Sequence, residues 1–365
     1  MTRAVGAVLR EYGGAFSVEP LTLAEPGPEE VLVRVKATGF CHTDHKVSHG
    51  ARGVPVPVVL GHEGAGIVEA VGAEVQSLDV GDHVVLTFAY CGRCPSCRAG
   101  HPAYCAHADE LNFGANGTAI RDADEELLNG AFFGQSSFAS HALVNARSAV
   151  RVDRDLPIEL LGPLGCSIQT GAGAVLNVLM PGEDSTLAVW GVGAVGCSAV
   201  IAAGWRGCRT IVALDVKAER LDLARELGAT HTIHVTGASG LQGLLELLPQ
   251  GVTHAFDTTG RPQTLADAVG GLASPGVALF VGGARAGDTV MFEVNQLLPG
   301  RTVQGTVQGD AVPQEFIPML ARRIKSGELP IQRLISHYPL DKINVAAADA
   351  SAGSVIKPVL VMPTD

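Results

Sequence analysis

Four cysteines within one short segment carry the clearest chemical signal in the sequence. Cys91, Cys94, Cys97 and Cys105 lie in CGRCPSCRAGHPAYC, at spacings of three, three and eight residues. Thiolates this close in sequence can surround one tetrahedral ion, and a closed shell of four leaves no position for a substrate. The segment therefore predicts a structural zinc site. An iron–sulfur cluster is an alternative, although ferredoxin spacings differ, and a pair of disulfides is another, although nothing else marks the chain as secreted.

A second set of possible metal ligands is spread along the chain. Cys41 lies in GFCHTDH, His62 in GHEGAG and Cys166 in PLGCSIQTG. A single Cys or His is usually packing or surface filler, but two cysteines and one histidine are a recognised zinc ligand set. That set leaves the fourth position open for water or substrate, as a catalytic zinc requires.

A G-x-G-x-x-G motif in the middle of the chain predicts a dinucleotide site. Gly191, Gly193 and Gly196 follow a predicted strand at 185–191 and open a predicted helix at 194–205. The motif requires this context, because its glycines allow a tight turn and the close approach of a pyrophosphate to a helix N-terminus.

Asp215 ends the next predicted strand, 19 positions after Gly196, where an acid that binds the adenosine ribose is expected. Its carboxylate would accept hydrogen bonds from both ribose hydroxyls and repel the 2′-phosphate of NADP, so we expect NAD as the cofactor. Arg220 lies nearby and could cover the adenosine end without reversing this preference. Alternatively, Asp215 has only a structural role in the turn at the end of the strand.

The rest of the pattern predicts an α/β protein with two domains. Short β segments separated by Gly and Pro fill roughly the first 150 residues, as in a mostly antiparallel domain. From about Ile168, strands alternate with helices, which is typical of a doubly wound, mainly parallel sheet. After about Thr306 the pattern loosens, with a helix predicted at 315–327 and a last strand at 355–362.

Composition narrows the possible partners and the compartment. The 365 residues are 47% hydrophobic and carry 26 Lys and Arg against 37 Asp and Glu, a net charge of −11, which opposes binding to nucleic acid or to an anionic membrane. The apolar run Leu187–Trp205 is long enough to resemble a membrane span, but its glycines divide it into strand, turn and helix. The N-terminus shows no signal-peptide pattern, and the chain has eight cysteines, so we expect the protein to be located in the cytoplasm.

With these motifs in place, the sequence resembles the zinc-dependent medium-chain alcohol dehydrogenases over essentially its whole length. The resemblance rests on the four-cysteine segment, the glycine motif and the segments VLGHEGAGIVEAVG (59–72), PLGCSIQTGAGAV (163–175) and GRTVQGTVQGD (300–310). CHTD, GAFFGQSSFASHAL (130–143) and the ending VIKPVLVM place it nearest the NAD-dependent aryl (benzyl) alcohol dehydrogenases. The resemblance implies a GroES-like catalytic domain, 1–165 with 308–365, and a Rossmann NAD-binding domain, 166–307.

The resemblance also implies roles for individual residues. Cys41, His62 and Cys166 would bind the catalytic zinc, with Glu63 just behind it. Asp44 would orient His62, and Thr43 would hydrogen-bond the substrate oxygen and start the proton relay. Predicted cofactor contacts are His42 with the pyrophosphate, Thr170 and Val281 with the nicotinamide, and, on a looser match, Lys357 with a phosphate.

The sequence departs from the family pattern at the relay position. Many members have a histidine five residues after the first zinc-ligand cysteine, where this chain has Lys46. His45 is adjacent but displaced by one position, and we favour an ordinary exposed histidine there. The proton would then leave through ribose and water.

The resemblance implies zinc-assisted, reversible hydride transfer between a primary alcohol and NAD, with two zinc ions per chain. Phe132 and Phe133 match pocket-lining positions of the family, and Thr87 matches a site often filled by a bulky ring. Flat apolar walls and extra room near the metal favour aryl or allylic alcohols of the benzyl type over ethanol. A core role for both phenylalanines is the alternative.

Three other functions stay open at this point. They are a general or terpenoid (geraniol-type) alcohol dehydrogenase, a non-catalytic NAD- and zinc-binding sensor, and a zinc-free quinone reductase. The retained ligands Cys41, His62, Glu63 and Cys166 oppose the last two. We expect a small-molecule alcohol or aldehyde substrate, a homodimer or homotetramer, and buried packing roles for Cys197 and Cys208.

Overall fold

The computed structural model describes residues 1–115, 120–237, 239–283 and 287–363. The chain divides into two compact units, Met1–Cys166 with Val312–Asp365, and Ser167–Ala311. The predicted domain boundaries lie after residues 165 and 307, so they differ from those of the compact units by one and four positions. As a result, Cys166 belongs to the same unit as the other predicted zinc ligands.

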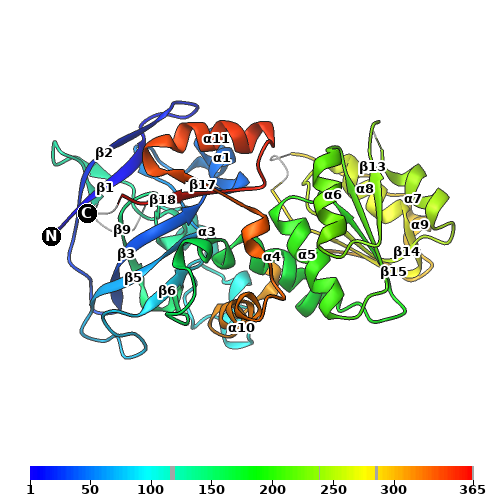
Figure 1. Cartoon of the computed structure of the whole chain (residues 1–365), viewed down its shortest axis with the longest axis horizontal. Helices are drawn as coiled ribbons and strands as arrows, with labels where there is room; N and C mark the ends of the chain where they lie inside the picture. Colours follow the sequence, from blue (N-terminus) through cyan, green and yellow to red (C-terminus); the bar gives the residue numbers. More distant parts are fainter. Residues whose placement is uncertain (116–119, 238, 284–286, 364–365) are drawn as a thin grey trace. The chain divides into compact units, whose positions relative to one another are not determined.

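The first unit contains two sheets (Figure 1). One is five-stranded in the order β4-β1-β2-β7-β8, and the other has the order β10-β6-β5-β3-β18-β17, with β9 also pairing with β3. Among the described residues, neighbouring strands of these sheets pair antiparallel, apart from the parallel pair β17 and β18. The strands are β1 (Thr2–Leu9), β2 (Phe16–Leu23), β3 (Glu30–Gly39), β4 (Val58–Val59), β5 (Gly64–Val71), β6 (His83–Leu86), β7 (Ile120–Arg121), β8 (Leu127–Leu128), β9 (His141–Asn145), β10 (Ala149–Arg151), β17 (Ile335–Pro339) and β18 (Lys357–Val361).

An apolar core fixes the loops of this unit. The rings of Phe40, which follows β3, and Phe138 are stacked with centroids 5.5 Å apart, and Phe16 meets both edge-on. These rings bury large areas, so the turns that begin beside them are held firmly. The helices of the unit are α1 (His42–Ser48), α2 (Pro95–Arg98), α3 (Ala108–Phe113), α10 (Pro313–Lys325) and α11 (Ile343–Ala352).

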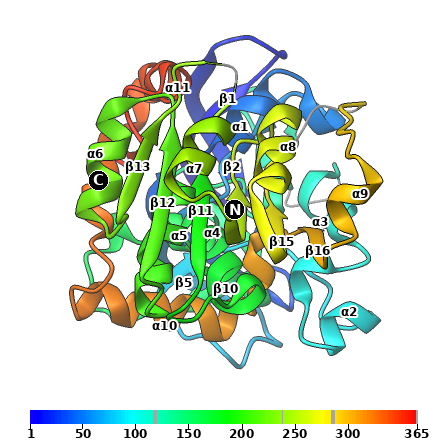
Figure 2. The same ribbon diagram turned by 90° about the vertical axis from the view of Figure 1, so that its right-hand side faces the viewer.

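The second unit is built on a six-stranded parallel sheet in the order β13-β12-β11-β14-β15-β16 (Figure 2). Its central strands are nearly continuous apolar runs such as TLAVW and TIVALD, as expected when helices cover both faces of a sheet. The strands are β11 (Thr186–Trp190), β12 (Thr210–Asp215), β13 (His231–His234), β14 (Val252–Asp257), β15 (Leu272–Phe280) and β16 (Arg301–Gly305), and the helices are α4 (Ser167–Gly173), α5 (Ala194–Trp205), α6 (Ala218–Glu226), α7 (Leu241–Leu247), α8 (Pro262–Gly270) and α9 (Val294–Leu297).

The strand order reverses at β11, because β12 and β13 lie on one side of it and β14 to β16 on the other. Ligands of doubly wound sheets bind beyond the carboxyl ends of the strands at such a point. The predicted fold class, a mostly antiparallel domain with a doubly wound cofactor domain, is confirmed.

The apolar run Leu187–Trp205 contains all of β11 except Thr186, the glycine turn and α5. Within the described ranges, we find no helix with the length and apolar character that a membrane crossing requires.

Candidate metal and dinucleotide sites

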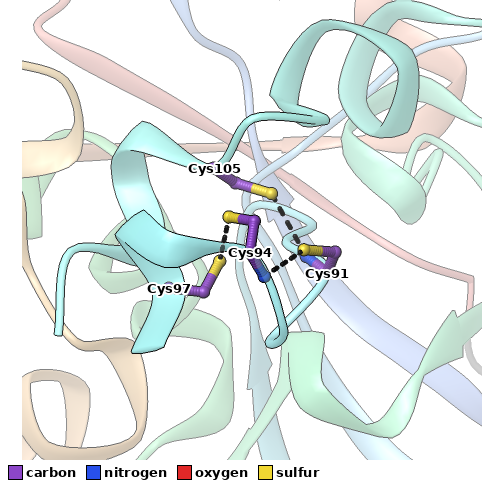
Figure 3. Close-up of side chains that lie close together, drawn as sticks. All are labelled: Cys91, Cys94, Cys97 and Cys105. Atoms are coloured by element: carbon purple, nitrogen blue, oxygen red, sulfur yellow. Dashed lines mark hydrogen bonds between the residues drawn. The ribbon is translucent and has the colours of Figure 1, made fainter. Parts of the chain in front are cut away.

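The four cysteines of the 91–105 segment converge in the structure (Figure 3). Their sulfur atoms all lie within 4.8 Å of one another, and those of Cys94 and Cys97 are 3.5 Å apart. Zn–S bonds of about 2.3 Å at tetrahedral angles require sulfur separations of about 3.8 Å, so the set fits a zinc ion. None of the eight cysteines, all of which lie in described parts of the chain, forms a disulfide.

Tight turns and backbone amides position these sulfurs. Gly92 and Gly100 have φ values of +70° and +88°, which glycine adopts at little cost. The backbone amide of Ala106 donates to Sγ of Cys94 at 3.5 Å and is the main reason that the pKa of this thiol falls to about 6. The local fold thus favours the thiolate of Cys94, the form that binds zinc, whereas burial raises the pKa of the Cys97 and Cys105 thiols.

Cys41, His62, Glu63 and Cys166 form a second group, whose ligand atoms also lie within 4.8 Å of one another. Cys41 is the N-cap of α1, His62 and Glu63 immediately precede β5, and Cys166 follows the turn Gly162–Gly165. All four belong to the first compact unit. The structure therefore brings together ligands that lie far apart in sequence.

Asp44 positions His62 within this group. Its Oδ1 accepts hydrogen bonds from the backbone amide of Gly61 at 3.1 Å and pairs with Nδ1 of His62 at 3.0 Å. Its Oδ2 accepts from the backbone amide of Cys41 at 2.8 Å, so one carboxylate also caps the first turn of α1. A carboxylate on Nδ1 fixes the ring so that Nε2 serves as the ligand atom.

Nε2 of His62 is buried and has no hydrogen-bond partner among the described residues. A buried polar atom without a partner costs free energy unless something binds it. With two cysteine thiols beside it, the donor set fits a zinc ion that keeps one position open.

Lys357 is buried beside Glu63, a contact that the sequence did not indicate. Its Nζ is 2.9 Å from Oε1 of Glu63 and donates to the carbonyl of Phe40 at 3.4 Å, and the two charged side chains are 3% and 0% exposed. Burial alone would lower the pKa of Lys357, but the Glu63 carboxylate outweighs that effect and raises it. The predicted contact of Lys357 with a cofactor phosphate stays a prediction, and the structure gives its ammonium group a buried partner in the first unit, Glu63.

The backbone around Glu63 leaves room for this residue only because positions 39 and 162 are glycine. A Cβ at Gly39 would lie 1.9 Å from Oε2 of Glu63, and one at Gly162 would lie 2.1 Å from its carbonyl oxygen. These close approaches surround the acid with backbone atoms and hold it behind the ligand group.

Phe132 and Phe133 both pack on the His62 ring. Phe133 is stacked on it with centroids 4.4 Å apart, and Phe132 meets it edge-on at 5.5 Å. Phe132 is fully buried and Phe133 is 8% exposed. The hydroxyl of Thr87 donates to the carbonyl of Gly165 at 2.9 Å, immediately before Cys166. All three residues thus lie at the ligand group, and both phenylalanines are also part of the core.

Helix α1 carries the predicted relay residues. Oγ1 of Thr43 lies 3.9 Å from Sγ of Cys41. The ring of His45 lies between those of His42 and His49, with centroids 5.9 and 4.5 Å away. His45 is half-buried, so it is not the exposed histidine that we favoured there, and burial lowers its pKa.

Gln135 is a site residue that the sequence did not indicate. Its amide nitrogen donates to the carbonyls of His62 at 3.0 Å and Thr87 at 3.3 Å, and its oxygen accepts from the amide of Gly64 at 3.2 Å. Gln135 thus links the backbone at His62 to the backbone at Thr87, the residue that follows β6. No local pattern could reveal this, because Gln135 and His62 are 73 residues apart.

The glycine motif forms the turn between β11 and α5. Gly191 has φ +83°, and a Cβ at Gly196 would lie 2.0 Å from the carbonyl oxygen of Gly191. Gly193 is the N-cap of α5 and has no side chain to satisfy the amides of its first turn, which suits a phosphate.

Asp215 lies at the carboxyl end of β12, next to this turn. Its Oδ2 accepts from the amide of Val192 at 2.8 Å and its Oδ1 from the amide of Lys217 at 3.0 Å. Each carboxylate oxygen can accept a second hydrogen bond, so ribose hydroxyls fit the same group.

Three more of the predicted cofactor residues lie in the same unit, whereas His42, on α1, belongs to the first unit. Thr170 is on α4, where its hydroxyl donates to Gln308 at 3.3 Å. Val281 follows β15, and its amide donates to the carbonyl of Asp257 at 2.9 Å. Arg220 is on α6 and is half-buried.

Comparison with known proteins gives the same assignment for both units. Residues 27–154 match the family described as the alcohol dehydrogenase GroES-like domain, and residues 194–325 match the family described as zinc-binding dehydrogenase. A geraniol dehydrogenase of Castellaniella defragrans is 42% identical over 364 residues, which cover 98% of this chain and 97% of that protein.

Two solved structures are similar over the full length of both chains. An alcohol dehydrogenase zinc-binding domain protein from Burkholderia ambifaria has a TM-score of 0.97 at 49% identity. A benzyl alcohol dehydrogenase from Acinetobacter calcoaceticus has a TM-score of 0.94 at 43% identity. The chain belongs to the zinc-dependent medium-chain alcohol dehydrogenase family.

Proposed function

We propose that this protein is an NAD-dependent dehydrogenase that oxidises primary aryl or allylic alcohols to aldehydes, reversibly, with a catalytic zinc ion at Cys41, His62 and Cys166. The observation that carries the proposal is the buried Nε2 of His62, which lacks a hydrogen-bond partner among the described residues and belongs to a ligand group with two thiols. A redox sensor or structural protein would have no need for this open ligand set with its orienting Asp44.

When bound, zinc would supply a Lewis acid that lowers the pKa of an alcohol hydroxyl, and the nicotinamide ring would supply the hydride acceptor. Asp44 would keep the His62 ring in its ligating orientation. The hydroxyl of Thr43, close to Cys41, would accept the alcohol proton and pass it outward. Lys46, in place of the usual histidine, would take no direct part in this transfer.

The second zinc ion would be structural and would occupy the Cys91, Cys94, Cys97 and Cys105 group. The four ligands close its coordination shell, so it would contribute to folding stability and not to the chemistry. We place the protein in the cytoplasm as part of this proposal, because thiolate-rich zinc sites require reducing conditions.

NAD is the proposed cofactor because of Asp215. Its negative charge at the ribose position would repel the 2′-phosphate of NADP and accept from the ribose hydroxyls of NAD. The two hydrogen bonds from Val192 and Lys217 hold the carboxylate at the edge of the sheet where this contact would occur.

The aryl or allylic preference is supported by Phe133, whose ring stacks on His62, and by the small side chain of Thr87. A flat apolar wall favours planar, unsaturated groups next to the reacting carbon. Thr87→Phe should narrow the space near the metal and reduce kcat/KM for benzyl alcohol more than for ethanol.

A panel of alcohols tests the proposal. We expect higher kcat/KM for benzyl alcohol, cinnamyl alcohol and geraniol than for ethanol, with NAD preferred to NADP. Geraniol and citronellol differ by the allylic double bond, so equal rates with these two would remove the allylic preference. A higher kcat/KM for ethanol than for benzyl alcohol would contradict the aryl assignment, and absence of turnover with every alcohol would contradict the enzymatic proposal.

We also propose that the protein is a homo-oligomer, a dimer or a tetramer. Three large apolar side chains on α9 or within three residues of it are strongly exposed, and α9 contacts the edge strand β16: Met291 is 92%, Val294 77% and Leu298 73% exposed. Exposed apolar clusters beside an unpaired strand edge commonly mark protein interfaces. Light scattering of the wild type and of Val294→Asp would test this, and a monomeric wild type would contradict it.

A further inference from the structure

One peptide unit of the glycine turn, Gly191–Val192, is held at both ends by side chains. The carbonyl oxygen of Gly191 accepts a hydrogen bond from Oγ1 of Thr258 at 2.7 Å. The amide of Val192, in the same peptide plane, donates to Oδ2 of Asp215 at 2.8 Å. Because both polar groups of one planar unit are bound, the orientation of that plane is fixed.

The order of the sheet explains how these two side chains meet at the turn. β11 lies between β12 and β14, Asp215 is the last residue of β12, and Thr258 directly follows β14. The peptide that leaves β11 therefore has a side-chain donor on one flank and a carboxylate acceptor on the other. A threonine hydroxyl has one proton, and the shorter distance to Gly191 than to the Trp190 carbonyl, 2.7 against 3.0 Å, favours Gly191 as the acceptor.

A third side chain holds the next carbonyl. Sγ of Cys197, on α5, donates to the carbonyl of Val192 at 3.3 Å. Cys197 is completely buried, and this burial raises the pKa of its thiol to about 12, so the sulfur keeps its proton and acts as a donor. Cys197 thus has a polar contact in addition to the packing role that we expected.

Reversing the Gly191–Val192 plane would be unfavourable on both sides. The carbonyl would turn toward the Asp215 carboxylate, and the hydrogen bond from Thr258 would be lost. Gly196 also matters, because any Cβ there would lie 2.0 Å from the present position of the Gly191 oxygen. The turn is therefore held in one conformation before any ligand arrives, and such preorganisation favours binding.

We propose that Thr258 and Cys197 are positioning residues for the dinucleotide: they hold the Gly191–Val192 turn in the conformation that admits the pyrophosphate at the start of α5. This proposal rests on the proposed function, since it requires a nicotinamide dinucleotide at the glycine motif. Neither residue needs to touch the cofactor, because each acts through the backbone of the turn.

The test uses full-length, zinc-loaded protein and Thr258→Val, which keeps the shape of the side chain and removes its hydroxyl. The loss of one hydrogen bond to a partly buried carbonyl should raise the Kd for NADH roughly five- to tenfold, read from the fluorescence of bound NADH. The KM for NAD should rise likewise, while the KM for the alcohol and the zinc content stay at wild-type values. Thr258→Ser should restore the Kd to within about twofold, because the donor returns.

Thr253→Val is the matched control. The hydroxyl of Thr253 donates to the carbonyl of Thr186 at 3.0 Å, between the same strands β11 and β14 but at their opposite end. Its loss should lower the melting temperature and leave the Kd for NADH unchanged. If Thr258→Val behaves in the same way, the residue is merely structural and the proposal is overturned.

Cys197 gives a second measurement if Thr258→Val fails to fold. Cys197→Ala should raise the Kd for NADH, whereas Cys197→Ser, which can still donate, should not. Wild-type affinity in Cys197→Ala would overturn the role of Cys197. A wild-type protein that binds neither NADH nor NADPH would instead contradict the proposed function, so the two failures are distinguishable.

Discussion

Replacing Lys357 with methionine should destabilise the first compact unit by several kcal/mol. Lys357 and Glu63 are 3% and 0% exposed, and their charged atoms are 2.9 Å apart. Removing one partner of a buried ion pair leaves an uncompensated charge and costs about 3–5 kcal/mol. Methionine keeps most of the buried volume, so this charge effect should dominate over any cavity. At about 2–4 °C per kcal/mol, the melting temperature should fall by roughly 10 °C.

Urea and thermal unfolding of four variants would test this magnitude. Lys357→Met and Glu63→Gln should each be destabilising, and the double variant should be more stable than the sum of the two losses predicts, because it leaves no unpaired charge. Lys325→Met is the surface control: Lys325 pairs with Asp153 with both side chains about half exposed, so its loss should cost much less than the loss of Lys357. The reasoning is refuted if Lys357→Met costs no more than Lys325→Met, or if the double variant is additive.

Three further predictions follow from single residues. Burial raises the pKa of Asp257 from 3.8 to about 6 in the folded protein, so the stability that this carboxyl contributes is complete below pH 3.8 and is lost as the pH rises through about 6. In the wild type, the free energy of unfolding should therefore fall between pH 4 and 8, and Asp257→Asn should reduce that fall by up to roughly 3 kcal/mol. An unchanged dependence of the unfolding free energy on pH in this variant would be inconsistent with the prediction. Thr43→Ala should lower kcat by about 10²-fold while Lys46→Ala changes it little, and equal, severe losses would make Lys46 a relay residue. Asp215→Ala should lower the ratio of kcat/KM for NAD to kcat/KM for NADP. The main cause should be weaker binding of NAD, since the Val192 amide also loses its acceptor. A wild type that already prefers NADP would refute the ribose role of Asp215.

The parts of the account that the sequence predicted are those encoded by short segments. The four cysteines of 91–105 and the glycines of 191–196 each lie within one turn-rich stretch, so their spacing alone limits how they can fold. The alternation of strands and helices after Ile168 likewise indicated the doubly wound sheet, because each strand is an apolar run between helical segments.

Contacts between distant segments could not be predicted in the same way. Lys357 and Glu63 are 294 residues apart, and only the pairing of β18 beside β3 shows that the lysine enters the interior of the first unit next to Glu63. Thr258 and Gly191 are 67 residues apart and meet because β14 crosses to the far side of β11. Such contacts depend on strand order, for which no local spacing carries a signal.

The zinc content of purified, alcohol-oxidising protein tests the central claim most directly. The two ligand groups predict two zinc ions per wild-type chain by elemental analysis. Cys166→Ser should retain one, at the four-cysteine group, and lose turnover with its fold largely kept. Fully active wild-type protein with one zinc ion or none, or a Cys166→Ser variant with unchanged activity, would contradict the account.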